Sequence, residues 1–136
     1  MALLGEEGKQ QHSVYHQAFV RDGGRCVYCD LDVLQSFDSF AASHLDHLKP
    51  KKNGGADNEP WNRVIACGVC NSLKGPFDPL PGEVVTPSTF KQWIDCASKH
   101  ISEKRGGTRD NSYWRDYQHW LTQMKRTDAS QETPLK

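Results

Sequence analysis

HLDHLKPKKNGGADNEPWNRVIACGVCNSLKG, residues 44–75, is the stretch that decides the fold. Its pattern predicts four elements in order: a strand over 43–48, a polar loop over 51–58, a return strand over 61–66 and a short helix over 67–74. Gly54-Gly55 supplies the turn of the loop, and Gly75 with Pro76 ends the helix, because neither residue continues a helix easily. The stretch therefore predicts a β-hairpin closed by one helix.

Two Cys-x-x-Cys pairs bracket the hairpin, Cys26 with Cys29 before it and Cys67 with Cys70 at the start of the helix. This spacing is typical of tetrahedral zinc, which binds thiolate sulfurs at about 2.3 Å. The 37 residues between Cys29 and Cys67 can hold the whole hairpin. Four thiolates leave no open position for a catalytic water, so we expect a structural zinc. We expect Cys96, which stands apart, to be a small, half-buried helix residue.

A zinc deaminase is the enzyme that this cysteine content would otherwise suggest. That chemistry needs His-x-Glu followed by Pro-Cys-x-x-Cys. Here His44-Leu45-Asp46 lacks the glutamate, and Ala66 rather than proline precedes Cys67. The deaminase reading is therefore rejected, and we interpret His44 as a structural residue.

Composition limits the function in other ways. The 136 residues are enough for one domain, and no apolar run approaches the roughly 20 residues that cross a bilayer, so no membrane partner is expected. The N-terminal sequence turns acidic at Glu6-Glu7, unlike a signal peptide, so we expect a cytoplasmic protein with reduced thiols. Net charge is zero, but residues 49–74 hold five basic and two acidic side chains, and 91–126 hold eight and four.

The segments on either side of the hairpin predict mostly helix. Ser13 is a candidate N-cap for a short helix ending at Gly23-Gly24, residues 31–43 have no clean period, and prolines keep 76–87 irregular. Two later stripes have helical spacing: Phe90, Trp93, Ile94, Ala97 and Ile101, then Tyr113, Tyr117, Trp120, Leu121 and Met124. We expect both to pack on the core, with a flexible N-terminus over 1–12 and a disordered tail over 127–136.

The polar residues of the hairpin complete a longer pattern. Asp46-His47 is followed by Pro50, Gly54-Gly55 and Asn62, and then by Cys67-x-x-Cys70-Asn71 with Lys74 three residues on. Over residues 13–76 this order resembles the HNH endonuclease family. The resemblance implies an α+β fold, a zinc-stabilised, treble-clef-like ββα-metal core over 13–76, with a helical extension over 77–126.

The same resemblance implies roles for single residues. Asp46 and Asn71 are the implied ligands of one catalytic divalent ion, His47 the general base, and Asn62 the residue that orients His47. Asparagine stands at the last position, where many members have histidine. The residue types agree with these roles, since histidine can take a proton near neutral pH and hard oxygen donors favour Mg²⁺ or Mn²⁺. Ni²⁺ and Co²⁺ stay open as alternatives.

Basic residues around the motif are candidate contacts to DNA phosphates. They are Lys49, Lys51, Lys52, Arg63 and Lys74. Lys74 lies three residues after Asn71, so both share one face of the predicted helix.

The resulting hypothesis is an endonuclease that hydrolyses DNA, and the resemblance implies 5′-phosphate and 3′-hydroxyl ends. Two alternatives stay open: a zinc-stabilised module that binds DNA without cutting it, and an accessory protein of packaging or recombination whose cutting depends on other subunits. A homodimer and a larger nucleoprotein complex are both compatible with the sequence. Nothing in it selects among restriction, homing, phage genome processing and toxin activity.

Overall fold

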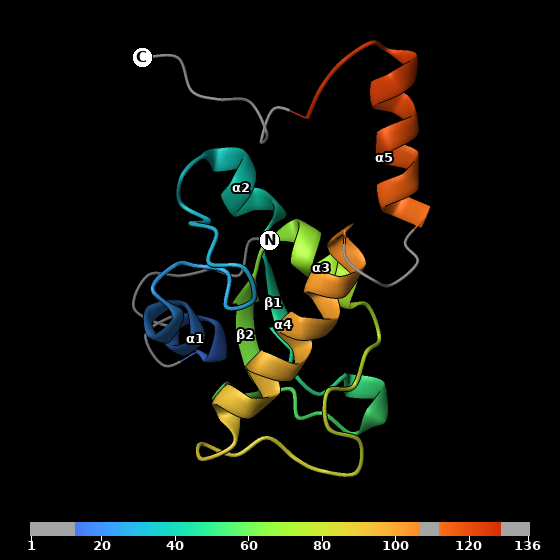
Figure 1. The fold of residues 1–136 in the computed structure, drawn as a ribbon. Coiled ribbons are helices and arrows are strands. Elements are labelled where there is room, and N and C mark those ends of the chain that lie inside the picture. The colour runs from blue at the N-terminus through green and yellow to red at the C-terminus, as the bar shows by residue number, and fades with distance from the viewer. Residues whose placement is uncertain (1–12, 107–111, 129–136) are drawn as a thin grey trace. The chain divides into compact units, whose positions relative to one another are not determined.

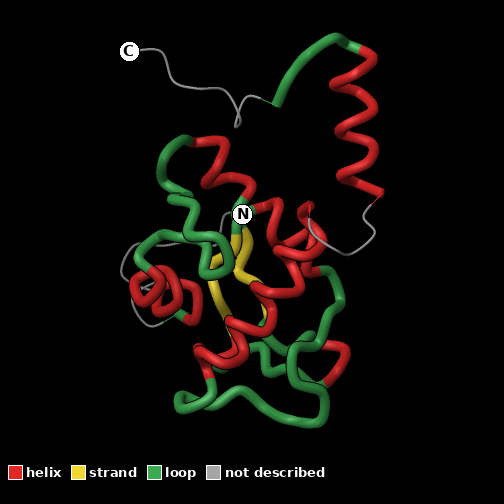
Figure 2. Tube along the Cα trace, viewed as in Figure 1, coloured by secondary structure: helices red, strands yellow, loops and turns green. Residues whose placement is uncertain are grey.

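The computed structural model of the chain describes residues 13–106 and 112–128 (Figure 1). The chain divides into two compact units, one ending at Ile101 and one beginning at Ser102. The first unit contains a two-stranded sheet surrounded by short helices (Figure 2). The expected small α+β fold is confirmed.

The sheet is the predicted hairpin. β1 (His44–His47) pairs antiparallel with β2 (Arg63–Ala66), and the register places Asp46 opposite Val64. The return strand begins later than the sequence predicts, because Pro60–Asn62 forms a 3-10 turn, η3, in which proline takes the first position. A second 3-10 turn, η2 (Lys51–Asn53), opens the connecting loop.

The loop between the strands is tightly closed at its glycine pair. Gly54 has a φ of 93°, in the left-handed region that favours glycine, and its N–H donates to the Lys51 carbonyl. A Cβ on Gly55 would lie 1.8 Å from the carbonyl oxygen of Lys49, so only glycine fits there. The two glycines therefore fold the loop back against the end of β1.

α1 (Val14–Asp22) is the predicted first helix. The Ser13 side chain accepts a hydrogen bond from the His16 N–H, and Gly23 ends the helix with a φ of 66°. The helix is fastened to β2 by its last two residues. Asp22 accepts from the Ile65 N–H at 2.9 Å, and the Arg21 guanidinium donates to the carbonyl oxygens of Pro60 and Arg63, both at 2.6 Å.

Residues 31–43, whose sequence has no clean helical or strand period, contain α2 (Phe37–Ala42), a helix that the sequence does not predict. Ser36 caps it, accepting from the Ser39 N–H, but the helix has six residues and buries none of them. A helix this short and exposed lacks the apolar stripe on which periodicity depends.

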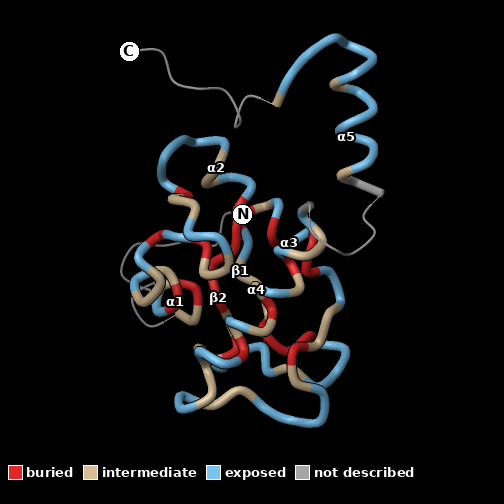
Figure 3. Tube along the Cα trace, in the orientation of Figure 1, coloured by how far each residue is buried: buried red, intermediate tan, exposed pale blue. Residues whose placement is uncertain are grey.

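Much of the core lies between the hairpin, α3 (Gly68–Lys74) and α4 (Phe90–Gly106), and a further buried cluster of Tyr15, Val33 and Ile65 joins α1 to β2 (Figure 3). Trp93 of α4 packs with Leu48 and Val64, and Ile101 packs with the buried cysteines. For residues 90–101, packing of the stripe on the core is therefore observed. α3 confirms the predicted closing helix.

α5 (Ser112–Gln123) belongs to the second unit and confirms the second predicted helix. Trp120 and Met124 are 60% and 62% exposed. Packing of this helix on the core stays a prediction. The predicted segment 1–12 and most of the tail 127–136 lie outside the described residues, as do Gly107 and the Tyr113 side chain. Among the helices that the structure describes, none has the length and apolar character needed to span a membrane.

Candidate metal and catalytic site

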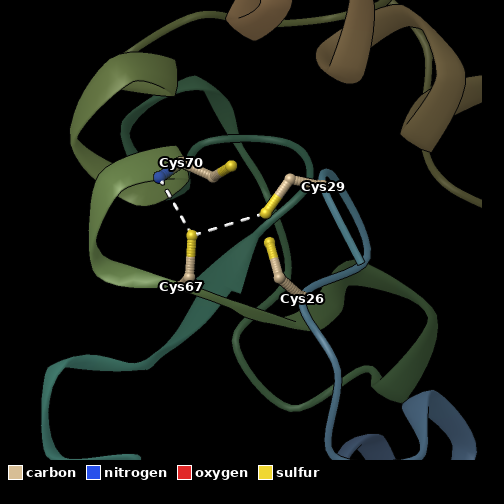
Figure 4. A group of neighbouring side chains, drawn as sticks. All are labelled: Cys26, Cys29, Cys67 and Cys70. Carbon is tan, nitrogen blue, oxygen red and sulfur yellow. Dashed lines mark hydrogen bonds between the residues drawn. The ribbon is translucent and has the colours of Figure 1, made fainter. Parts of the chain in front are cut away.

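The four paired cysteines converge on one point. Their sulfur atoms all lie within 4.8 Å of one another, and Cys29 Sγ lies 3.7 Å from Cys67 Sγ (Figure 4). A tetrahedral zinc with sulfurs at about 2.3 Å separates those sulfurs by about 3.8 Å. The cluster is therefore positioned to bind a metal such as zinc, as the sequence predicts. Cys26, Cys67 and Cys70 are buried, whereas Cys29 is exposed.

Two elements build the cluster. The Cys26–Cys29 knuckle is a tight turn in which Cys26 N–H donates to the Leu31 carbonyl and Asp30 N–H donates to the Cys26 carbonyl. Cys67 is the N-cap of α3, and its sulfur accepts from the Cys70 N–H at 3.4 Å. A metal held here joins the segment before the hairpin to the helix after it.

Contacts between the thiols shift the pKa values of three of the four cysteines. Hydrogen bonds from Cys26 and Cys70 lower the pKa of Cys67 to about 2. The hydrogen bond with Cys67 raises the pKa of Cys26 to about 12, and the bonds with Cys26 and Cys67 raise that of Cys70. The Cys67 thiolate is thus stabilised by its contacts with Cys26 and Cys70. Four thiolates so close together need the charge of a metal to coexist.

Asp46 lies near the middle of β1 and is only 13% exposed at its side chain. Its Oδ2 accepts a hydrogen bond from the Tyr28 hydroxyl at 2.6 Å and lies 3.5 Å from the Lys74 ammonium. Burial raises the pKa of Tyr28 well above its ordinary value, and the Asp46 charge adds to that shift. No described residue donates a hydrogen bond to Asp46 Oδ1, so that oxygen is available to a cation.

Lys74 connects α3 to the two motif residues of β1. Its side chain is 1% exposed, and its ammonium donates to the His47 carbonyl at 2.8 Å. Burial lowers the pKa of Lys74, and the nearby charge of Asp46 opposes that shift. The lysine therefore holds the helix that carries Asn71 against the strand that carries Asp46.

Asn71 lies on α3 and is half-buried. Within the described part of the chain its side-chain amide makes no hydrogen bond, while its main chain takes part in the helix. Amide and carboxylate oxygens are both hard donors of the kind that divalent cations such as Mg²⁺ take. The donor set of Asp46 and Asn71 therefore fits such an ion.

His47 has a carboxylate partner that the sequence does not reveal. Its Nε2 lies 2.7 Å from Asp57 Oδ1, ten residues along the chain. Hydrogen bonds from His47 and Lys51 lower the pKa of Asp57 below its usual 3.8, and Arg63 contacts the same carboxylate at 3.3 Å. An ionised Asp57 can only accept, so a neutral His47 carries its proton on Nε2 and has its lone pair on Nδ1.

Asn62 is buried and fastens the loop that follows His47. Its side chain accepts from the Lys49 N–H at 2.8 Å and donates to the carbonyls of Lys49 and Ala56. Its own carbonyl accepts from the Leu48 N–H. These contacts fix the backbone directly after His47, whereas the ring itself is contacted by Asp57. An orienting role for Asn62 stays a prediction.

The five basic candidates differ in their surroundings. Lys51 and Lys52 are exposed, whereas Lys49 is buried and ion-paired with Asp78 at 2.9 Å. Lys74 is buried as described, and the partly buried Arg63 donates to the Leu45 carbonyl. Phosphate contact stays a prediction for each of them.

Sequence reasoning missed three residues of this site: Tyr28, Asp57 and Asp78. The sequence does contain a signal for Tyr28, since this residue lies between Cys26 and Cys29, but a tyrosine at such a position is equally typical of core packing. Asp57 and Asp78 lie in loops, where no periodicity predicts which way a side chain points.

Comparisons with known proteins agree with the motif. Residues 26–77 match the family model described as HNH endonuclease. Among curated proteins, the CRISPR-associated endonuclease Cas9 of Corynebacterium diphtheriae is 28% identical over 121 residues. The match covers 87% of this chain but 9% of that protein, so the chain spans a small part of its relative. No solved structure matches the chain.

The matched segment contains both cysteine pairs, the hairpin and α3. The order of the motif residues, the antiparallel hairpin and the cluster of four thiols all agree with this match. Residues 26–77, the segment that carries the motif, are therefore similar to the HNH endonuclease family.

Proposed function

We propose that the chain is a metal-dependent endonuclease that hydrolyses the phosphodiester bonds of DNA. One observation supports this most strongly. Asp46 and His47 are adjacent on β1, and Lys74 of α3 contacts both residues, which brings the helix of Asn71 against them. A module that only bound DNA would not need this arrangement.

In this proposal Asp46 Oδ1 and the Asn71 side-chain oxygen hold one divalent cation, Mg²⁺ or Mn²⁺. When bound, the ion polarises the phosphate and stabilises the departing oxygen. The two ligands carry one negative charge, and Lys74 lies 3.5 Å from that charge. Metal binding is therefore loose until phosphate oxygens complete the shell.

His47 acts as the general base through Nδ1, because Nε2 faces the Asp57 carboxylate. It takes a proton from a water molecule whose oxygen then bonds to phosphorus. The bond from phosphorus to the 3′ oxygen breaks, and a solvent proton completes the 3′-hydroxyl. The 5′-phosphate stays on the other fragment. Asp57 stabilises the positive charge that the ring acquires.

The exposed Lys51 and Lys52 lie in the loop that begins four residues after His47. As flexible cations at the rim of the site, they are the candidates to hold the DNA backbone. In contrast, Lys49 and Lys74 are buried and paired with Asp78 and Asp46, so they act within the protein. Lys51 is exposed although it lies 3.4 Å from the Asp57 carboxylate.

The direct test is cleavage of supercoiled plasmid by the purified, zinc-containing chain, with Mg²⁺ or Mn²⁺ added to metal-depleted buffer. We expect nicked or linear product only when a divalent ion is present, with zinc content unchanged before and after. Equal cleavage in buffer with no added ion would contradict the one-metal mechanism. Binding without cleavage of any DNA form under any ion would favour the binding module.

A further inference from the structure

Tyr28 lies inside the cysteine knuckle, between Cys26 and Cys29, yet its hydroxyl contacts the proposed catalytic centre. Its ring packs against both the cysteine cluster and the cluster of Leu48, Val64 and Trp93. We propose that Tyr28 is a positioning residue that sets Asp46 for the divalent cation and thereby couples the thiolate site to the catalytic site. This inference rests on the proposed function.

The first step of the argument concerns the Asp46 carboxylate. Within the described part of the chain, its two partners lie at the same oxygen, Oδ2: the Tyr28 hydroxyl at 2.6 Å and the Lys74 ammonium at 3.5 Å. Held there, the group presents Oδ1 in one fixed direction. Hydrogen bonds of this kind orient a ligating carboxylate, and losing one typically weakens metal affinity by about 10- to 100-fold.

The second step concerns what holds Tyr28. Its neighbour Val27 donates its N–H to the Ile65 carbonyl at 3.0 Å, which ties the knuckle to β2. The flanking cysteines join the knuckle to Cys67 and Cys70 at α3. A metal on the four sulfurs therefore fixes the segment that carries the hydroxyl. Occupancy of one metal site then sets the geometry of the other.

A purely structural role is the competing interpretation, since a buried tyrosine hydroxyl needs a hydrogen-bond partner in any case. The two interpretations differ in what they predict. A structural role changes stability and leaves metal affinity at Asp46 unchanged. A positioning role changes that affinity while zinc content stays the same.

The experiment is Tyr28→Phe, which keeps the ring and removes only the hydroxyl. Mn²⁺ binding is measured by electron paramagnetic resonance without DNA, alongside zinc content and thermal unfolding. Mn²⁺ is a suitable probe because thiolate sites select softer metals. Tyr15→Phe is the matched control, because Tyr15 is a buried tyrosine of α1 outside both sites.

We expect Tyr28→Phe to weaken Mn²⁺ binding about 10-fold with one zinc per chain retained, and Tyr15→Phe to leave Mn²⁺ binding unchanged. In cleavage assays, Tyr28→Phe should need more Mg²⁺ for half-maximal rate and approach the wild-type rate at saturation. Unchanged or tighter Mn²⁺ binding in Tyr28→Phe overturns the coupling.

The outcomes separate this inference from the proposed function. Weaker Mn²⁺ binding in Tyr28→Phe, with no DNA cleavage by the wild type, supports the positioning role and contradicts the nuclease. Metal-dependent cleavage by the wild type, with equal Mn²⁺ affinity in the wild type and Tyr28→Phe, supports the nuclease and contradicts the positioning role. A wild type that binds no Mn²⁺ and cleaves nothing contradicts both.

Discussion

Asp46 and His47 are neighbours in the chain but have separate surroundings. Successive side chains of a strand point to opposite faces, so Asp46 meets Tyr28 and Lys74 while His47 meets Asp57. In the proposed function, Asp46 holds a cation and His47 moves a proton. Replacing each should therefore have a different kinetic signature.

His47→Ala should lower the cleavage rate by about 100- to 10,000-fold, the usual contribution of a general base. Zinc content, unfolding temperature and DNA affinity should stay close to wild type, since the ring acts in the transition state. Single-turnover kinetics and a filter-binding assay measure the two effects separately. A parallel loss of DNA binding would identify His47 as a contact residue instead.

Changes to the two proposed ligands should alter the metal response. Asp46→Asn removes the only ligand charge, so its cleavage should be weak and partly restored by extra Mg²⁺ or Mn²⁺. Asn71→His adds a nitrogen ligand and should shift preference toward Mn²⁺, Co²⁺ or Ni²⁺. Titrating each ion against cleavage rate tests both. His47→Ala is the control, because added metal cannot replace a base, and its rescue by metal would contradict this assignment.

The sequence predicted the thiol cluster because two Cys-x-x-Cys pairs are compatible with few structures other than a metal site. It did not predict Asp57 or Tyr28, because their contacts join segments 10 and 18 residues apart along the chain. It also could not show that Lys49 and Lys74 are buried, since a lysine beside a motif is usually exposed.

At the scale of elements, a largely buried ion pair also holds the loop after β1. Lys49 and Asp78 have side chains 9% and 10% exposed, the ammonium lies 5.7 Å from the Trp93 ring centre, and Asn53 donates to the same carboxylate. Burial raises the pKa of Asp78, but the hydrogen bonds from Lys49 and Asn53 outweigh it and bring the pKa below the usual 3.8. The loop, the irregular segment and α4 thus meet at Lys49.

Asp78→Asn should lower the free energy of unfolding at pH 7 by about 3 kcal/mol, because it leaves the Lys49 ammonium buried without a counter-charge. The folded-state pKa of Asp78 is depressed. The stability that the pair contributes is therefore fully present above the unfolded value near 3.8 and is lost as the pH falls through the lower folded-state pKa. Urea unfolding at pH 7, 5 and 3 should show the difference between wild type and variant shrinking at the lowest pH.

Asp95→Asn is the control for that measurement. Asp95 pairs with Lys91 on the surface of α4, where the side chains are 63% and 86% exposed. Such a pair contributes at most about 0.5 kcal/mol. Equal losses in the two variants would show that burial of the Lys49 pair adds nothing.

At the scale of the molecule, the small hairpin has few apolar residues to bury, and the thiol cluster supplies a second centre of stability. The sequence predicted α4 and α5 from their stripes, yet periodicity alone cannot say which stripe packs on which core. Residues 90–101 bury Trp93, Ala97 and Ile101, whereas α5 lies in a second unit with Trp120 largely exposed.

Cys67→Ser should lose the zinc and most of the folded structure, because metal binding and folding are coupled at such sites. Metal analysis and circular dichroism check this, with Cys96→Ser as the control. The Cys96 thiol lies outside the cluster and donates a hydrogen bond to the Pro79 carbonyl, so that variant should keep one zinc per chain. A well-folded, reduced wild type without zinc would contradict the prediction.

The fastening of α1 to β2 has a further consequence, for solubility. A two-stranded sheet has two open edges, each able to pair with a strand of another molecule. Here the outer edge of β2 is already occupied. The Asp22 carboxylate accepts from the Ile65 N–H, and the Val27 N–H donates to the Ile65 carbonyl. The Arg21 guanidinium donates to the Arg63 carbonyl. On β1, the Arg63 guanidinium covers the Leu45 carbonyl. Within the described residues, side chains and one turn thus take the place of a neighbouring strand at the outer edge of β2, which leaves that edge less open to edge-to-edge aggregation.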